Sequence, residues 1–272
     1  MNFGMRGHDI VADNIDDLIK GCNALGVKSL QLALNLSVAG FKPGMFSPAY
    51  AKQMSRVFEQ NGIDISILSC YINPSNTDTE VLKKDMDFFV EILKYARFMN
   101  AGMVALETGY VGEDCIPEKN HTEEAYQYLL SNMRKLCDAA EKLGVMIGIE
   151  GVHLFVIDSP KKMRRLLDDL NSPNICVVLD PCNLINMQNY ENRDEIVREA
   201  FELLGDEIAV IHLKDFVMED GAMKGVLPGK GIMNTKELLT LATTRKPNIP
   251  IMLEGVTEKD FAEVKATLEA LF

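Results

Sequence analysis

The sequence contains no tryptophan, only 4 histidines and no cysteine pair with C-x-x-C spacing. So few histidines argue strongly against a His-rich cluster of several metal ions. The 6 cysteines are spread singly through 272 residues, so we expect buried reduced thiols rather than a disulfide framework. This pattern favours the cytoplasm.

Basic charge is also scarce, because 28 Lys and Arg face 40 Asp and Glu, which leaves a net charge of −12. A chain this acidic has no electrostatic footprint for a nucleic-acid backbone and is repelled by an anionic membrane surface. No run approaches the roughly 18 apolar residues that span a bilayer, and we expect no secretory signal. An anionic small molecule is still allowed, since one local cationic pocket can outweigh the mean field.

Short apolar runs alternate with amphipathic segments along the chain, in which 47% of residues are hydrophobic. Runs such as ICVVLD are apolar on successive residues, as expected of strands covered on both faces. The predicted strands are residues 3–6, 29–34, 65–71, 103–108, 146–151, 175–180, 208–213 and 251–255. The predicted helices are residues 15–25, 48–61, 80–99, 123–143, 160–170, 193–204, 235–243 and 258–271.

Eight strand–helix repeats predict an α/β fold, a (β/α)8 TIM barrel that occupies residues 1–272 as a single domain. The alternative is a doubly wound open sheet, but its usual nucleotide-binding signatures are missing. Two long connections, 109–120 and 215–231, follow the fourth and seventh strands. In a barrel both would lie at the carboxyl ends of the strands, where the active site is built.

Ionisable residues end four consecutive strands: Glu150, Asp180, His212 and Glu254. Any one of them has a simpler explanation, because a strand-end carboxylate often caps the next helix. Together they would bring three carboxylates to one buried rim, and a divalent cation would relieve their repulsion. Oxygen-rich ligation with one imidazole suits Mn²⁺ or Mg²⁺, with Co²⁺ and Zn²⁺ as alternatives.

Further candidates lie beside this set. Lys214 is two residues from His212, so its side chain falls on the same face of the strand and is expected to bind substrate. Glu107 ends the fourth strand and is expected to bind substrate or to pair with Lys214. His153 follows the fifth strand and could reach a substrate hydroxyl, although a surface role is equally open. Asp215 could orient the imidazole.

The segment GVLPGKGIMN follows the seventh strand and contains Lys230 between two glycines. Barrels often bind phosphate at this place. Turn geometry explains the glycines equally well, so the segment only suggests a phosphate site.

The order Glu150, Asp180, His212 and Glu254, with the HLKD and PGKG segments, resembles the sugar phosphate isomerase/epimerase superfamily of xylose isomerase-like barrels. The resemblance extends over essentially the whole chain. It implies that these four residues bind one divalent ion, often manganese, and that the two glutamates act as acid and base across a bound ketose. Members include ketose 3-epimerases, hydroxypyruvate isomerase and inosose dehydratase.

The sequence departs from the ketose 3-epimerases in the residues that hold their substrate. Asn183 stands where they usually have a histidine, Val156 where they have a glutamate, and Met218 where they have an arginine. The implied metal set is therefore intact while the epimerase substrate clamp is not. Asn183 remains a candidate substrate-binding residue.

These observations predict a metal-dependent isomerase or epimerase of a small ketose, keto-polyol or sugar phosphate. Glu150 and Glu254 would move the proton α to a carbonyl, and the metal would stabilise the enediolate. A dehydratase of a keto-inositol or related sugar and a non-catalytic sugar-binding module are the alternatives. A zinc-dependent apurinic endonuclease would need many histidines and a basic face for DNA. With 4 histidines and a net charge of −12, the sequence argues against this function. Homo-oligomer formation is left open.

Overall fold

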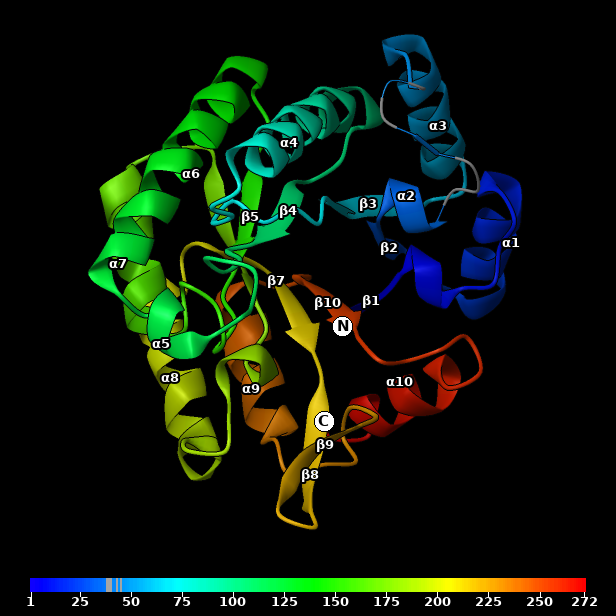
Figure 1. Ribbon diagram of the computed structural model, residues 1–272. Helices are drawn as coiled ribbons and strands as arrows, with labels where there is room; N and C mark the ends of the chain where they lie inside the picture. Colours follow the sequence, from blue (N-terminus) through cyan, green and yellow to red (C-terminus); the bar gives the residue numbers. More distant parts are fainter. Residues whose placement is uncertain (38–40, 43, 45) are drawn as a thin grey trace.

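The computed structural model describes residues 1–37, 41–42, 44 and 46–272. Its parallel strands close into a barrel in the spatial order β1-β10-β7-β6-β5-β4-β3-β2 (Figure 1). The strands are β1 (Asn2–Arg6), β2 (Ser29–Leu32), β3 (Asp64–Ser69), β4 (Val104–Glu107), β5 (Ile147–Glu150), β6 (Ile175–Leu179), β7 (Ile208–Leu213) and β10 (Pro250–Leu253). All the predicted strands and the predicted (β/α)8 barrel are confirmed.

Helices follow the barrel strands and surround the barrel (Figure 1). The main ones are α1 (Ile15–Leu25), α3 (Pro48–Gln60), α4 (Thr79–Met99), α6 (Glu123–Leu143), α7 (Pro160–Leu170), α8 (Arg193–Leu204), α9 (Thr235–Arg245) and α10 (Phe261–Glu269). Short helices α2 (Leu34–Ser37) and α5 (Pro117–Asn120) and the 3-10 turns Gly7–Asp9, Cys182–Leu184 and Tyr190–Asn192 lie between them. The predicted helices are confirmed, although the last one is shorter than the predicted range of 258–271.

Local hydrogen bonds set where several helices begin and end. The Ser47 hydroxyl accepts a bond from a backbone N–H in the first turn of α3. Asn234 accepts from the N–H of Glu237, and its amide donates to the Glu237 carboxylate, which joins both residues at the start of α9. Gly26 and Gly144 end α1 and α6 with φ values of 71° and 64°, a conformation that glycine adopts without strain.

The barrel has two apolar cores. The larger core fills the space between the strands and the surrounding helices. A smaller cluster fills the barrel interior and consists of Ile67, Met103, Ala105, Cys176, Val178, Val210 and Met252. Side chains alternate between the two faces of a strand, so the residues two positions further along each strand point into the same interior, one layer nearer the carboxyl end.

The connection after β7 contains a two-stranded antiparallel hairpin, β8 (Asp215–Glu219) and β9 (Ala222–Val226). It projects from the carboxyl end of β7 (Figure 1). The sequence analysis expected only a long connection over residues 215–231. The strands of the hairpin are partly exposed, so they lack the apolar run that revealed the barrel strands.

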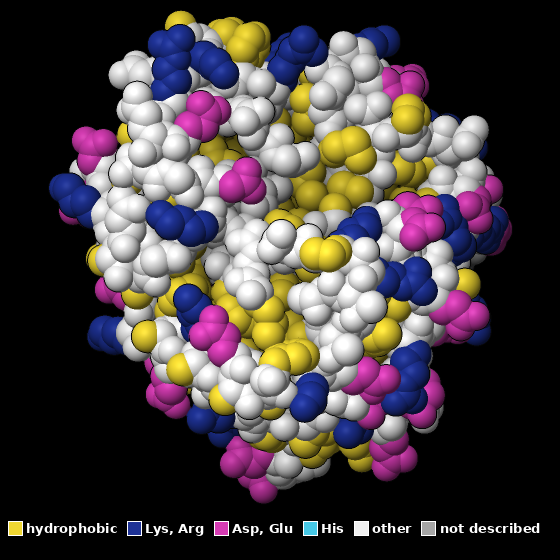
Figure 2. Space-filling view, turned by 180° about the vertical axis from the view of Figure 1, so that it is seen from behind, with side chains coloured by type: hydrophobic (Ala, Val, Ile, Leu, Met, Phe, Trp, Pro, Cys, Tyr) yellow, Lys and Arg dark blue, Asp and Glu magenta, His cyan; other side chains and the backbone are white. Residues whose placement is uncertain are grey.

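Acidic and basic side chains are interspersed around the periphery of the face shown in Figure 2, and hydrophobic side chains line a hollow near its centre. The surface of this face therefore carries charges of both signs. Within the part of the chain that the structure describes, no helix is both long and apolar enough to cross a membrane.

Candidate metal centre

One layer above the apolar interior, each barrel strand presents a polar side chain. These positions follow the interior residues by two: for example, Glu150 follows Gly148, and His212 follows Val210. The complete layer is Arg6, Gln31, Ser69, Glu107, Glu150, Asp180, His212 and Glu254. The strand alternation that builds a barrel therefore also builds a closed ring of polar groups at its carboxyl end.

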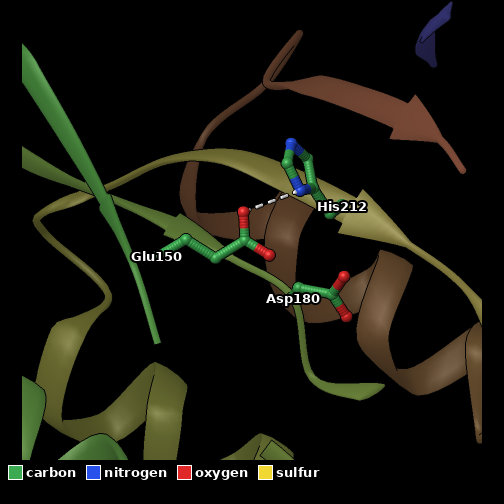
Figure 3. A group of neighbouring side chains, drawn as sticks. All are labelled: Glu150, Asp180 and His212. Carbon is green, nitrogen blue, oxygen red and sulfur yellow. Dashed lines mark ion pairs between the residues drawn. The ribbon is translucent and has the colours of Figure 1, made fainter. Parts of the chain in front are cut away.

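Glu150, Asp180 and His212 converge on one side of this ring, as Figure 3 shows. One ligand atom from each lies within 4.8 Å of the others, and all three side chains are buried. Nδ1 of His212 is 3.2 Å from Oε2 of Glu150 and 3.0 Å from Oε1 of Glu254. The structure thus brings together the four residues predicted to form the site. Glu254 joins the other three through its contact with the imidazole of His212.

These residues fit a divalent cation. Neither ring nitrogen of His212 makes a hydrogen bond with any described residue, although the residue is only 2% exposed. The two carboxylates beside Nδ1 are satisfied either by a protonated imidazole or by a cation that they share with it. Two ligands at about 2.1 Å from one octahedral ion are about 3.0 Å apart, which matches the contacts of Nδ1. Carboxylate oxygens with a single imidazole suit Mn²⁺, Mg²⁺ or Zn²⁺.

Two cations lie against the same carboxylates. Nζ of Lys214 is 2.8 Å from Oδ2 of Asp180 and 2.9 Å from Oε2 of Glu254. Nη1 of Arg6 is 3.3 Å from the same Glu254 oxygen. Lys214 was expected to bind substrate, and the structure places its ammonium group directly at the candidate centre. Its pairing with Glu107, which the sequence analysis also considered, is not formed among the described ion pairs.

The charges at the centre shift its pKa values. Burial acts to lower the pKa of His212, but the carboxylates of Glu150 and Glu254 prevail and raise it to about 9. Burial acts to raise the pKa of Glu254, but His212, Lys214 and Arg6 hold it below its usual value. Glu254 therefore stays a carboxylate at neutral pH, the form that binds metal and accepts a proton.

Glu107 lies beside Glu150 in the register of β4 and β5. Burial, followed by the charge of Glu150, raises the pKa of Glu107 to about 7. Its carboxyl group therefore exchanges protons near neutral pH at the edge of the candidate centre. Its predicted contact with substrate stays a prediction.

Asn183 connects two parts of the centre. Its amide nitrogen donates to Oε1 of Glu150 at 2.6 Å, and its amide oxygen accepts from Nζ of Lys214 at 3.1 Å. His153 lies next to it, with Nδ1 3.1 Å from the Asn183 carbonyl oxygen. The asparagine that replaces the epimerase histidine is thus bound to the candidate metal ligands. Substrate binding by Asn183 and His153 stays a prediction.

The expectation that Asp215 orients the imidazole of His212 is wrong in this structure. Both carboxylate oxygens of Asp215 accept hydrogen bonds from backbone N–H groups, namely those of Phe216, Gly229, Gly231 and Met233. Asp215 is the first residue of β8, and its side chain fastens the segment that returns from the hairpin. No described hydrogen bond joins it to His212.

The polar residues on the first three strands were not predicted from the sequence. Arg6 contacts Glu254, and Gln31 donates to the Ser69 hydroxyl at 3.0 Å in the buried interior. Tyr71 follows β3, and the charges of Glu254 and Glu150 act on its hydroxyl. The available signal was a polar residue two positions after a small or apolar interior residue, as in Gly4 and Arg6.

The two other positions at which the sequence departs from the epimerase pattern lie in apolar surroundings. Val156 is 1% exposed and packs in the apolar core. Met218 lies on β8 and packs against that core from the hairpin. Neither side chain can replace the charged residue of the epimerases.

A closed barrel with a buried carboxylate–imidazole cluster at its carboxyl end defines a (β/α)8 protein with a candidate metal centre. The family described as xylose isomerase-like TIM barrel matches residues 13–271, and the chain belongs to this family. No curated protein matches the sequence.

Several solved structures share the fold. A D-tagatose 3-epimerase-like protein is 18% identical over 100% of this chain and 97% of its own, with a TM-score of 0.77. The probable 3-DHS dehydratase AsbF from Bacillus anthracis is 13% identical over 100% and 98%, with a TM-score of 0.76. The IolI protein, whose structure holds a zinc atom, is 15% identical over 100% and 98%, with a TM-score of 0.73. Identities of this size show a common fold.

Proposed function

We propose that the protein is a metal-dependent isomerase or epimerase of a small ketose, keto-polyol or sugar phosphate. The observation that carries the proposal is the buried cluster of Glu150, Asp180 and His212, whose ligand atoms lie within 4.8 Å of one another, with Glu254 3.0 Å from the imidazole. The likeness to an epimerase-like protein and to a zinc-containing structure supports it.

Glu150, Asp180, His212 and Glu254 would hold the ion, with Mn²⁺ proposed and Mg²⁺, Co²⁺ or Zn²⁺ as alternatives. When bound, a divalent ion supplies Lewis acidity, which polarises a substrate carbonyl and makes the α-proton removable at neutral pH. The chain supplies the groups that move this proton.

The two glutamates divide their oxygens between binding and proton transfer. Oε2 of Glu150 and Oε1 of Glu254 face Nδ1 of His212 and would be taken up by the ion. Oε1 of Glu150 and Oε2 of Glu254 point to hydrogen-bond donors instead. In the proposal, Glu254 accepts the α-proton on Oε2, and Glu150, protonated on Oε1 before the step, gives its proton to the opposite face for an epimerisation. Proton exchange with solvent then restores the starting state of both glutamates.

A dehydratase is the second candidate, and Lys214 favours it. Its ammonium group lies at the centre, 2.8 Å and 2.9 Å from two of the proposed ligands. After removal of the α-proton, a hydroxyl group leaves as water if a nearby acid protonates it. In this candidate reaction the Lys214 ammonium group would hold that hydroxyl by a hydrogen bond, and Glu107, whose pKa is raised to about 7, would supply the proton, since the neighbouring carboxylates raise the pKa of Lys214. The likeness to a probable dehydratase is consistent with this reaction.

Deuterium exchange tests the proposal without knowledge of the product. Protein loaded with Mn²⁺ is incubated in D2O with a panel of ketoses, keto-inositols and their phosphates, and each compound is analysed by mass. We expect one deuterium at the α-carbon of at least one compound, and none after treatment with a chelator. A dehydratase would instead release a product lighter by one water. Binding without either change would identify a non-catalytic sugar-binding module.

A further inference from the structure

Backbone N–H groups of the segment that follows the hairpin surround the carboxylate of Asp215. The N–H groups of Gly229 and Gly231 donate to Oδ2 of Asp215 at 3.0 Å and 2.8 Å. Those of Phe216 and Met233 donate to Oδ1 at 2.9 Å and 3.0 Å. Converging backbone N–H groups of this kind form an anion-binding concavity. Here the anion is the 3% exposed carboxylate of Asp215.

This arrangement removes the phosphate site that the sequence suggested. The glycine-rich segment after the seventh barrel strand is a place where barrels bind phosphate through backbone N–H groups. In this protein three of those groups, on Gly229, Gly231 and Met233, are already bonded to Asp215. Lys230, in the same segment, pairs with Glu263 on the surface at 3.3 Å.

The cations at the mouth of the barrel are also engaged. Arg6 contacts Asp9 at 2.7 Å and Glu254 at 3.3 Å. Lys214 contacts both Asp180 and Glu254. Each of these cations therefore lies between two carboxylates, and Glu107 and Glu150 add further negative charge. One divalent ion would bring the centre close to neutral but would leave no described cation there for a phosphate or carboxylate.

Uncharged groups without a partner are also found among the described residues at this end of the barrel. Oε1 of Gln31 is buried in the polar ring and has no hydrogen-bond partner among the described residues. The Tyr71 side chain follows β3, has its hydroxyl near Ser69, and is 49% exposed. Exposed apolar side chains also lie on the connections that follow barrel strands: Val11, Leu36, Leu154 and Met187. An acceptor for a hydroxyl and apolar surface for carbon–hydrogen faces suit a neutral polyol.

We propose that this site takes an uncharged polyhydroxy ketone and discriminates against phosphate esters and carboxylates of the same skeleton. This inference rests on the proposed function, and it narrows the substrate class. The cause is local: the backbone anion site is filled by Asp215, and both cations at the mouth are shared between carboxylates.

Matched compounds test it directly. Binding of D-xylulose and D-xylulose 5-phosphate, and of D-fructose and D-fructose 6-phosphate, is measured by titration calorimetry on the Mn²⁺-loaded protein at fixed ionic strength. We expect the neutral member of at least one pair to bind about tenfold tighter or more than its phosphate. Equal or tighter binding of the phosphates would overturn the inference, and so would the absence of binding by every neutral member.

A variant tests the cause. Asp9→Asn leaves Arg6 with one carboxylate instead of two, so the preference for the neutral compound should narrow several-fold. Asp16→Asn, on the exposed surface of α1, removes the same charge without touching Arg6 and should leave the preference unchanged. An unchanged preference in Asp9→Asn, or an equal change in Asp16→Asn, would contradict the role of the paired cations.

Deuterium exchange on the same samples separates this inference from the proposed function. Neutral ketoses that bind selectively but exchange no proton would refute the proposed reaction and leave the selectivity standing. Phosphate esters that bind more tightly and exchange their α-proton would support the reaction and refute the selectivity.

Discussion

Nδ1 of His212 lies 3.0 Å from Oε1 of Glu254. The register of β7 and β10 sets this contact, because His212 pairs with Met252, and Glu254 follows Met252 on the same face. Backbone hydrogen bonds between strands therefore hold the imidazole and the carboxylate together, although the imidazole makes no described hydrogen bond. Without metal the two groups form an ion pair, and in the proposed function a shared ion takes its place.

Replacement of the imidazole should release the metal. His212→Ala removes the nitrogen ligand, so the affinity of the protein for Mn²⁺ should fall. Removal of a residue that only orients a metal ligand costs roughly 10–100-fold in affinity, and we expect a larger loss here. Metal content after dialysis against limiting Mn²⁺ measures this loss. His121→Ala is the control, because His121 lies on the surface beside Asp158 and its loss should leave one ion per chain. Full metal content in His212→Ala would refute the site.

Lys214 should stabilise the metal-free protein more than the metal-loaded one. Lys214→Met leaves Asp180 and Glu254 without the ammonium group that lies between them. We expect a loss of about 2 kcal/mol without metal, less than the roughly 3–5 kcal/mol for a fully buried pair because Lys214 is partly exposed. Thermal unfolding with and without Mn²⁺ should show a smaller loss when the ion is bound.

Lys230→Met provides the control for this comparison, since Lys230 pairs with an exposed glutamate on the surface. Its melting temperature should stay close to that of the wild type in both conditions. A loss in Lys214→Met that is equal with and without metal would show that the ammonium group packs structurally and does not balance the charge of the metal ligands.

The Asp215 carboxylate leaves no room for a side chain at Gly231, so a substitution there should lower the stability of the protein. A Cβ at Gly231 would collide with Oδ1 of Asp215 and with the carbonyl oxygen of Phe216. We therefore expect Gly231→Ala to cost about 1–3 kcal/mol in the free energy of unfolding. Urea unfolding measures the cost. Gly225→Ala, in the same hairpin, meets nothing within 4 Å and should be close to neutral; similar losses in both variants would contradict the packing described for Asp215.

Much of the barrel and of the candidate centre could be predicted because both follow from short-range patterns. Buried parallel strands are apolar on successive residues, so ICVVLD and similar runs stood out. Glu150, Asp180, His212 and Glu254 stood out for the same reason, since each interrupts or ends such a run with an ionisable group. Closure of the barrel then brings these strand ends together.

The rest depends on contacts between distant segments. The four backbone bonds to Asp215 require the hairpin to fold back, and the partly exposed hairpin strands have no strong pattern. The role of Arg6 depends on β1 lying next to β10, which only barrel closure provides. The cytoplasmic location and the absence of nucleic-acid binding stay predictions from composition, and homo-oligomer formation stays open.

The central claim is that metal-bound carboxylates at the barrel mouth exchange a proton α to a carbonyl, and Glu254→Gln tests it most directly. An amide oxygen can still bind a metal ion but cannot accept the proton. Deuterium incorporation from D2O into the best ketose of the panel and metal content should be measured on the same Mn²⁺-loaded sample. We predict that exchange falls by roughly 10²–10⁴-fold while most of the metal is retained. A variant that keeps its exchange rate with metal bound would contradict the account.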